Sequence, residues 1–562
     1  MRVLVLFFLL FSFSSCIKTS GGKKSTETQL ESLPDNSLEE NDDEVENTEN
    51  DYSDKKENED EDSEDDTSTN TSEIKEIFVD ASGEGDFSNI IDAIKNKSKK
   101  IFIRNGTYEV DDTILIDYPD VELTGESKDG VQIIQTNNQK DLMVVMSDNI
   151  KISELTLDTL THNAQSAFVE AGANNLLLEN NIIKGGENIF SVYFAGPPVS
   201  SEGSNCEECL YKDETIDVYL ENGESYFRLS SNNIVLNNQI SSEYDGDGIS
   251  FALQKSGRFV NNSISGAMLS VYLVKDTIVA GNTINNSLQS GIYLTLPSEN
   301  VYINNNEIID PVFHGVVVKP QYMEHGHKDE NIISKDVEIS HNTIKALVNG
   351  ISVEGYDQEH VTWGKLEEVD VLNNSVFQKD FTGVFYNNLE KSDLADNTIV
   401  FENCSKNYRG NDINGDGFPD VPSIASRSSV GIRLYNNLST INILNNSIKK
   451  HESCSGKENL DPNDPSLGEI NIEDFTLQNA ISIGDAGIVG SHSIDSINIV
   501  DNEFVNEVDD WVHSNTTILN DTYFIGEYSD LDVDSFDGID MQDLIFSSEV
   551  RSESNTNIIT NP

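Results

Sequence analysis

Residues 290–309 read SGIYLTLPSENVYINNNEII, and close variants of this stretch recur through the second two thirds of the chain. It contains three short apolar segments, GIYLTL, NVYI and EII, separated by the polar turns PSE and NNN. In the first segment Ile292 and Leu294 alternate with Tyr293 and Thr295, as in a strand with one buried face. A repeated unit of about 20 residues with three strands predicts one coil of a stacked solenoid.

The most regular mark of the repeat is an asparagine followed two residues later by an apolar residue. The shortest gaps between these asparagines are 20 to 24 residues, which fits a bare coil, and longer gaps fit coils that carry insertions. Asparagine tolerates left-handed backbone in tight turns, and stacked asparagine amides can hydrogen-bond along a pile. We therefore expect successive coils at Asn181, Asn238, Asn262, Asn282, Asn306, Asn342, Asn374, Asn397, Asn446 and Asn502.

The folded part is predicted to begin with IFVDASGEGDFSNIIDAIKNKSKKIFIRNGTYEV, residues 77–110. The pattern predicts a strand at 77–79, a helix at 88–95 with Ile90, Ile91 and Ile94 on one side, and a strand at 101–104. These residues resemble the entry of the pectin-lyase-like family of right-handed parallel β-helices, in which the helix caps the open end of the coil. The resemblance implies an all-β, right-handed parallel β-helix with a short N-terminal capping helix. Because lyases, hydrolases, esterases and non-catalytic proteins share this entry, it implies a fold and not a reaction.

The first 16 residues, MRVLVLFFLLFSFSSC, place Arg2 before an apolar run and small residues before Cys16, which predicts a secretory signal. The segment resembles a bacterial lipoprotein signal, in which Cys16 would be lipidated, although Phe13 stands where that signal prefers leucine. An ordinary signal with an incidental cysteine and an uncleaved anchor are the alternatives. The resemblance implies a lipoprotein at the outer membrane or cell surface, held to the membrane through its lipid only.

Residues 17–76 are predicted to be a disordered acidic tether. Between residues 27 and 66 the chain holds 20 acidic residues, two lysines and almost nothing apolar, so this part cannot bury enough surface to fold. An acidic segment that binds calcium or a partner is the alternative. The β-helix domain is expected over residues 77–530 and a C-terminal tail over residues 531–562.

The formal charge of -63, from 99 acidic and 36 basic residues, disfavours nucleic-acid binding. The chain has no net positive field with which to displace counterions from phosphates. The same charge disfavours polyanionic ligands unless a local basic patch or a bound cation intervenes.

Four cysteines besides Cys16 suit two disulfides in an exported protein. Cys404 follows Asn397 by seven residues and Cys454 follows Asn446 by eight, so both fall at nearly the same place on consecutive coils. The spacing of about 4.8 Å between coils suits a disulfide between them. The other two, Cys206 and Cys209, are interpreted as a loop staple, with a metal site as the weaker alternative.

Aligning the strands equivalent to GIYLTL gives two columns of outward-facing residues. Such a surface, mixing aromatic, cationic and carboxylate side chains, suits sugar binding. Long loops after Lys319, Glu354, Cys404 and Ile448 are expected to rise beside it. The first column is Ser250, Ser270, Tyr293, Val317, Ser352, Phe385, Arg433 and Ser482. The second is Ala252, Tyr272, Thr295, Lys319, Glu354, Asn387, Tyr435 and Gly484, and Asp247, Ser290, His314, Asn349 and Thr382 precede the strands.

Two functions follow from this surface. The first is lyase-type β-elimination of a uronate polysaccharide, which needs a cation beside the carboxylate and a base for the proton. The second is a non-catalytic adhesin or glycan-binding surface protein. A glycoside hydrolase is the weaker enzymatic alternative, because Asp247 and Glu354 are predicted to lie four coils apart, roughly 19 Å. The candidate catalytic residues are Lys319, Arg433, His314 and Tyr293, and the candidate substrate-binding residues are Asp247, Tyr272, Glu354 and Tyr435. An ordinary ion pair of Lys319 with Glu354 is the structural alternative for that pair.

The segment DINGDGFPD predicts a calcium loop. Asp412, Asn414, Asp416 and Asp420 have the alternating spacing of calcium ligands, and Gly417 permits the turn. The segment resembles the short calcium loops of thrombospondin type 3 repeats, which implies a structural calcium ion. An Asx-rich turn without metal is the alternative.

Overall fold

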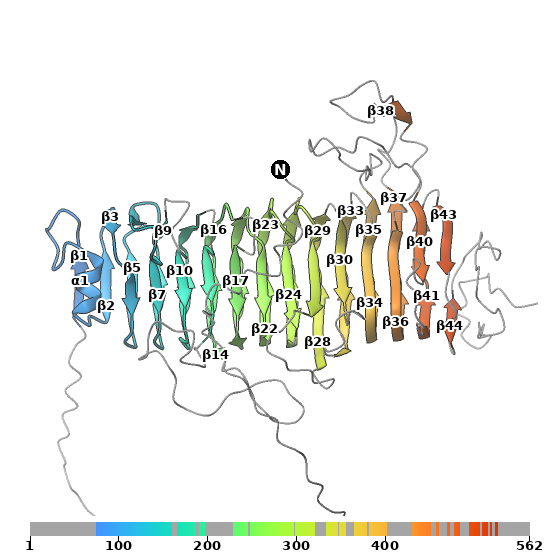
Figure 1. Cartoon of the computed structure of the whole chain (residues 1–562), viewed down its shortest axis with the longest axis horizontal. Helices are drawn as coiled ribbons and strands as arrows, with labels where there is room; N and C mark the ends of the chain where they lie inside the picture. Colours follow the sequence, from blue (N-terminus) through green and yellow to red (C-terminus); the bar gives the residue numbers. More distant parts are fainter. Residues whose placement is uncertain are drawn as a thin grey trace, which may run out of the picture.

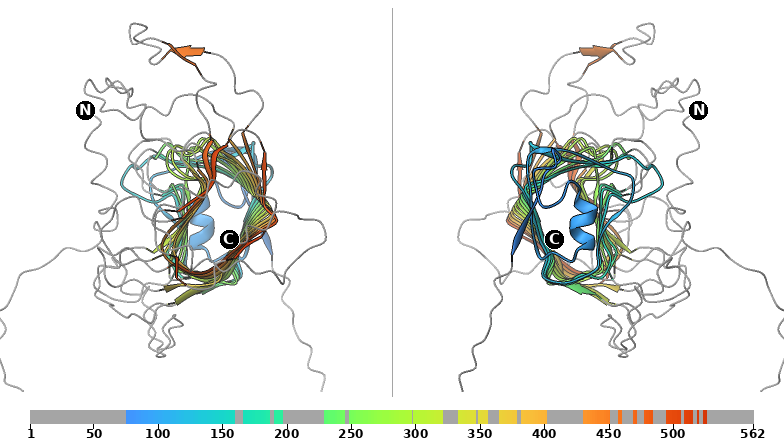
Figure 2. Two further views of the ribbon diagram at one scale, coloured as in Figure 1. Left: turned by 90° about the vertical axis from the view of Figure 1, so that its right-hand side faces the viewer. Right: turned by 90° about the vertical axis from the view of Figure 1, so that its left-hand side faces the viewer.

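The computed structural model describes residues 75–159, 166–186, 190–196, 229–244, 248–296, 298–320, 333–346, 348–355, 365–378, 382–401, 430–450, 457–459, 469–471, 477–483, 494–505, 508–514, 518–519 and 523–525. The chain winds into a long coil whose turns lie side by side along the long axis (Figure 1). The view along that axis shows the strands of successive coils superimposed around a common interior (Figure 2). The chain is a right-handed parallel β-helix, as its resemblance implies.

Most coils contribute one strand to each of three parallel ladders, named here sheets I, II and III, and sheets I and III are joined into one larger sheet through β34 and β36. Sheet I contains β1 (Glu76–Val79), β2 (Lys100–Ile103), β5 (Glu122–Gly125), β8 (Lys151–Ser153), β11 (Leu177–Glu179), β15 (Ile234–Leu236), β19 (Arg258–Val260), β22 (Lys275–Ala280), β25 (Glu299–Asn304), β28 (Ile333–Ser340), β32 (Val369–Leu372), β41 (Ile494–Val500), β44 (Ile518–Leu519) and β45 (Tyr523–Ile525). Sheet II contains β3 (Gly106–Val110), β6 (Val131–Gln135), β9 (Thr156–Asp158), β12 (Ile182–Lys184), β16 (Gln239–Ser241), β20 (Ser263–Ser265), β23 (Thr283–Asn285), β26 (Glu307–Ile309), β29 (Thr343–Ala346), β33 (Ser375–Gln378), β35 (Thr398–Phe401), β37 (Ser447–Lys450) and β42 (Glu503–Val505).

Sheet III is the ladder whose outward residues formed the predicted columns. It contains β4 (Ile114–Ile116), β7 (Met143–Val145), β10 (Phe168–Glu170), β13 (Val192–Phe194), β17 (Ile249–Ala252), β21 (Leu269–Tyr272), β24 (Ile292–Leu296), β27 (Val316–Pro320), β30 (Asn349–Glu354), β34 (Thr382–Ala395), β36 (Val430–Leu444), β40 (Leu477–Ile483) and β43 (Val508–Ser514). The long strands β34 and β36 continue into sheet I. The short strands β14 (Ser230–Ser231), β18 (Gln254–Lys255) and β31 (Lys365–Leu366) add to the ladders, and β38 (Lys457–Asn459) pairs with β39 (Glu469–Asn471) in an antiparallel hairpin.

The opening stretch of sequence forms one coil of three strands, β24, β25 and β26, as predicted. Ile292 and Leu294 point inward and are fully buried, whereas Tyr293 is half-buried on the outside. Thr295 also belongs to the outward column but is only 1% exposed, and its hydroxyl donates to the carbonyl of Val271. The alternation predicted from the sequence is therefore correct, although an outward residue is not always accessible.

All ten predicted asparagines form one continuous ladder. In each step the backbone N–H and the side-chain Nδ2 of one asparagine both donate to Oδ1 of the next, as Asn282 does to Asn306 at 3.0 and 2.9 Å. The same double contact joins every neighbouring pair from Asn181 to Asn502. The ladder asparagines are at most 7% exposed, so these hydrogen bonds lie inside the protein.

The left-handed backbone falls on the residue before each ladder asparagine and not on the asparagine itself, contrary to the expectation from the sequence. These preceding residues have φ between 53° and 65° and are mostly Asn or Asp, which tolerate this conformation. The ladder asparagine contributes its amide, and its neighbour makes the turn. The preceding residues are Asn180, Asn237, Asn261, Gly281, Asn305, His341, Asn373, Asp396, Asn445 and Asp501.

The N-terminal end is covered by the predicted helix, α1 (Ile90–Lys95), which packs beside β1 and β4 (Figure 1). Its N-cap residue Asn89 accepts a hydrogen bond from the backbone N–H of Asp92 at 2.8 Å. The buried face consists of Ile90, Ala93 and Ile94, so Ile91 is less buried than the sequence predicted. Among the described residues, no helix has the length and apolar character needed to cross a membrane.

Candidate functional site

The register of sheet III confirms the strand alignment predicted from the sequence. Ser270 pairs with Tyr293, Tyr293 with Val317, and Val317 with Ser352. The column continues through Phe385 and Arg433 to Ser482. Residues that are far apart in the sequence therefore line up on one outer surface of the solenoid, which we call the sheet III face.

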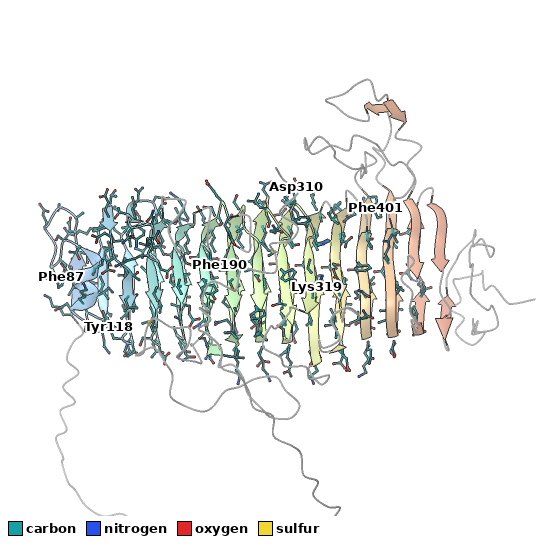
Figure 3. All side chains as sticks on the ribbon, viewed as in Figure 1. Phe87, Tyr118, Phe190, Asp310, Lys319 and Phe401 are labelled. Carbon is teal, nitrogen blue, oxygen red and sulfur yellow. The ribbon has the colours of Figure 1, made fainter. Side chains whose placement is uncertain are left out.

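A charged group lies on this face at β27 and β30. Lys319 Nζ is 3.1 Å from Glu354 Oε2, so the ion pair that the sequence left as an alternative is formed. Ser352 Oγ donates to the other oxygen, Glu354 Oε1, at 2.9 Å. Figure 3 labels Lys319 among the central coils. Because the side chains of Lys319 and Glu354 are 45% and 21% exposed, the pair is accessible to a ligand but carries no net charge.

His314 lies at the start of β27 and is held in one orientation. Its Nδ1 accepts a hydrogen bond from the backbone N–H of Asn349 at 3.3 Å, which leaves the proton of a neutral ring on Nε2. Burial lowers the pKa of His314 below its ordinary value, the nearby Glu354 opposes this effect, and Lys319 adds to it. The ring is therefore neutral near pH 7.

The four candidate catalytic residues do not share one position along the face. Tyr293 and Lys319 lie on neighbouring strands, because Tyr293 pairs with Val317 two residues before Lys319. Arg433 lies on β36, three strands beyond Lys319. At about 4.8 Å per strand this separation is roughly 14 Å, more than one sugar ring bridges. Arg433 and Lys319 would therefore contact different units of a polymer.

A cluster of aromatic side chains at the N-terminal part of the sheet III face was not predicted from the sequence. Phe190, labelled in Figure 3, stacks on Tyr193 with ring centroids 4.7 Å apart and an interplanar angle of 12°. Tyr244 packs edge-on against Phe190 at 6.4 Å. We call these three residues, together with Tyr272 and Tyr293, the aromatic cluster.

Register joins the remaining tyrosines to this cluster. The column of Tyr193 runs through Ser250 and Ser270 to Tyr293, and Tyr272 lies on the strand next to Tyr293. Tyr193 and Tyr293 are three strands apart, roughly 14 Å, so they would contact different units of an oligosaccharide. The two serines are 3% and 5% exposed, whereas the tyrosines are half-buried. Burial, and then the nearby Tyr193, raise the pKa of Tyr272 well above its ordinary value, so its phenol stays protonated.

Several predicted site residues lie outside the described part of the chain. They are Cys16, Cys206, Cys209, Cys404, Cys454, Asp247, Asp412, Asn414, Asp416 and Asp420. The backbone of Tyr435 pairs with Asn387 as predicted, but its side chain is not described. Within the described ranges, no group of three or more His, Cys, Asp or Glu side chains is placed to hold a metal ion.

No protein-family model matches the chain, and no curated protein matches it in sequence. Several solved structures are similar to it. PfbA, a surface adhesin of Streptococcus pneumoniae, is 13% identical with a TM-score of 0.44, over 64% of this chain and 87% of that one. The A-module of the Azotobacter vinelandii mannuronan C-5 epimerase AlgE6 is 11% identical with a TM-score of 0.36, over 81% and 93%. The catalytic domain of a GH87 alpha-1,3-glucanase is 12% identical with a TM-score of 0.33, over 74% and 68%. By its own three parallel ladders, the chain has the right-handed parallel β-helix fold of the pectin-lyase-like proteins.

Proposed function

We propose that the sheet III face between β13 and β30 binds carbohydrate. The observation that carries this proposal is the aromatic cluster, in which half-buried rings flank the small buried side chains of Ser250 and Ser270. Aromatic rings stack on the apolar faces of sugar rings, and nearby polar groups bind their hydroxyls. Glu354, Lys319 and His314 supply such polar groups further along the same face.

The charges on the face favour a neutral glycan over a polyanion. Lys319 is compensated by Glu354, and His314 is held neutral by burial. The chain as a whole has a charge of -63, which repels polyanions at long range. Export and lipid attachment at Cys16 would present this face at the cell surface, as an adhesin or glycan receptor requires.

Replacing single rings of the cluster tests the proposal. We expect Tyr193→Ala and Tyr293→Ala each to weaken binding about tenfold, because each removes one stacking surface from the sugar. The measurement is binding of the full chain to a glycan array, followed by titration with the best neutral oligosaccharide. Tyr302→Ala is a matched control, because Tyr302 is 38% exposed but lies on β25 of sheet I. Unchanged affinity in both cluster variants, or an equal loss in the control, would contradict the proposal.

A second function, β-elimination of a uronate polymer, is favoured by one arrangement. Tyr293 and Lys319 lie on neighbouring strands, with His314 at the start of β27. In this reaction a base removes the proton beside the carboxylate, the carbon–oxygen bond to the leaving sugar breaks, and a double bond forms in the remaining sugar. The released oxygen takes up a proton and becomes a hydroxyl group. A cation must neutralise the carboxylate of the substrate. Lys319, on the strand next to Tyr293, is the candidate for this role.

The lyase function predicts unsaturated products, which absorb in the ultraviolet. If the chain is a lyase, it releases such products from a panel of uronate polysaccharides with calcium present, and Lys319→Ala or Tyr293→Ala lowers the rate at least about 100-fold. Lys275→Ala is the control, because Lys275 also forms an ion pair, with Glu299 at 3.2 Å, but lies on β22 of sheet I. Binding of a glycan without any absorbing product would leave the adhesin-type function and reject the lyase.

A further inference from the structure

Glu170, the last residue of β10, is a carboxylate inside the coil. Its side chain is completely buried, and its strand neighbour Phe194 points into the same interior. A buried carboxylate is unfavourable unless hydrogen bonds compensate for its lost hydration. The structure supplies five donors: the backbone N–H groups of Gly172 at 2.6 Å, of Gly196 at 3.3 Å and of Ala173, Ser230 Oγ at 2.8 Å, and Gln254 Nε2 at 3.3 Å.

Two of these donors lie at opposite ends of residues 197–228. Gly196 is the last described residue before that segment, and Ser230 lies just after it, at the start of β14. One carboxylate therefore contacts the chain on both sides of residues 197–228. The backbone carbonyl of Glu170 also accepts a hydrogen bond, from the N–H of Ala195 at 3.0 Å.

The network extends to a third coil. Gln254, which donates to Glu170, accepts a hydrogen bond from Asn233 Nδ2 at 2.9 Å. Asn233 also donates to the carbonyl of Ala173 and accepts from the N–H of Leu176. Gln254 and Asn233 are completely buried. A satisfied buried network of this kind favours one arrangement of the backbone around it.

The clamped backbone leads directly into the proposed glycan site. Gly196 follows Tyr193 by three residues, and Tyr193 stacks on Phe190. We propose that Glu170 is a positioning residue, which fixes both ends of the 197–228 insertion and thereby holds Tyr193 and Phe190 in the aromatic cluster. The clamp itself rests on the contacts above, and its effect on glycan binding rests on the proposed function.

Limited proteolysis of the full chain with trypsin tests the clamp. Within residues 197–228 the sequence offers Lys212 and Arg228 as cleavage sites. We expect Glu170→Gln to speed cleavage at these two sites at least about tenfold. The side-chain NH₂ group of glutamine would point at groups that are themselves hydrogen-bond donors, so some of the hydrogen bonds of Glu170 would be lost. Ser230→Ala, which removes a single hydrogen bond, should speed it several-fold. Ser392→Ala is the matched control, because Ser392 is a buried serine that accepts one hydrogen bond, from the N–H of Val369.

Three readouts separate the clamp from a general loss of stability and from the glycan proposal. The melting temperature of Ser230→Ala should equal that of Ser392→Ala, while only Ser230→Ala shows faster cleavage at Lys212 and Arg228. Unchanged cleavage at these sites in Ser230→Ala would overturn the clamp, even if Glu170→Gln does not fold. Suppose that the wild type binds glycan and that Tyr193→Ala weakens this binding. Glu170→Gln and Ser230→Ala should then each weaken glycan binding several-fold. Unchanged affinity in these two variants would refute the positioning role of Glu170. Failure of the wild type to bind any glycan would reject the proposed function and leave the proteolysis result standing.

Discussion

Replacing Asn306 by alanine is expected to lower the free energy of unfolding by about 3 to 4 kcal/mol. Asn306 lies in the middle of the ladder and is 2% exposed. Its Oδ1 accepts hydrogen bonds from the backbone N–H and from the side-chain Nδ2 of Asn282. Its Nδ2 donates to Asn342 Oδ1 and to the backbone carbonyl of Val279. Alanine would remove these four hydrogen bonds inside the protein, and Asn342 Oδ1 would keep only the one from the backbone N–H of residue 306. Removing one partner of a buried hydrogen bond is the costly way to lose it.

Urea unfolding of the wild type and Asn306→Ala measures this effect. Because each coil contacts only its neighbours, hydrogen exchange should show lost protection at the coils on either side of residue 306 before the ends of the solenoid. Asn138→Ala is the control, since Asn138 is an exposed asparagine and its loss should cost less than about 0.5 kcal/mol. A destabilisation by Asn306→Ala no larger than that of the control would show that the ladder does not hold the coils together.

The second large effect is a dependence of stability on pH that comes from Glu170. Burial raises the pKa of Glu170 from 4.5 to about 7, and the hydrogen bonds from Ser230, Gly172, Ala173 and Gly196 oppose that rise. The folded-state pKa is above the unfolded-state value, so the folded protein binds the proton more tightly. The contribution of this group to stability is therefore present at low pH and is lost as the pH rises through about 7.

Between about pH 5 and about pH 8 this loss amounts to about 2 to 3 kcal/mol. The many other carboxylates also titrate, so the quantity to measure is the difference between the wild type and Glu170→Gln, which cannot titrate at this position. We expect the wild type to lose about 2 to 3 kcal/mol more of its free energy of unfolding than the variant over this pH range, measured by urea unfolding at each pH. Parallel pH profiles of the two proteins would contradict the raised pKa of Glu170.

The fold could be predicted because the repeat is written into the sequence at a visible period. At a ladder position such as Asn306, no other residue type gives the same pair of hydrogen bonds. The spacing of these asparagines in the sequence therefore marks the coils directly. The alternation of Ile292, Tyr293 and Leu294 then fixes which side chains face outward. From these two patterns the alignment of Tyr293 with Ser352 and Arg433 followed, and the register confirms it.

The aromatic cluster and the clamp could not be predicted in the same way. Tyr193 lies on β13, which is separated from β17 by the long 197–228 segment, so its place in the column was hidden by the irregular spacing. Glu170 occupies an inward strand position, where the pattern predicts an apolar residue. Its hydrogen-bond partners come from other coils, and no local signal announces them.

The central claim is that the aromatic cluster on the sheet III face binds sugar. A crystal structure of the chain with its best-binding neutral oligosaccharide tests this claim most directly. We expect a sugar ring in van der Waals contact with the ring of Tyr193, Tyr272 or Tyr293, near Ser250 and Ser270. An oligosaccharide bound on sheet I or sheet II, with the cluster empty, would contradict it.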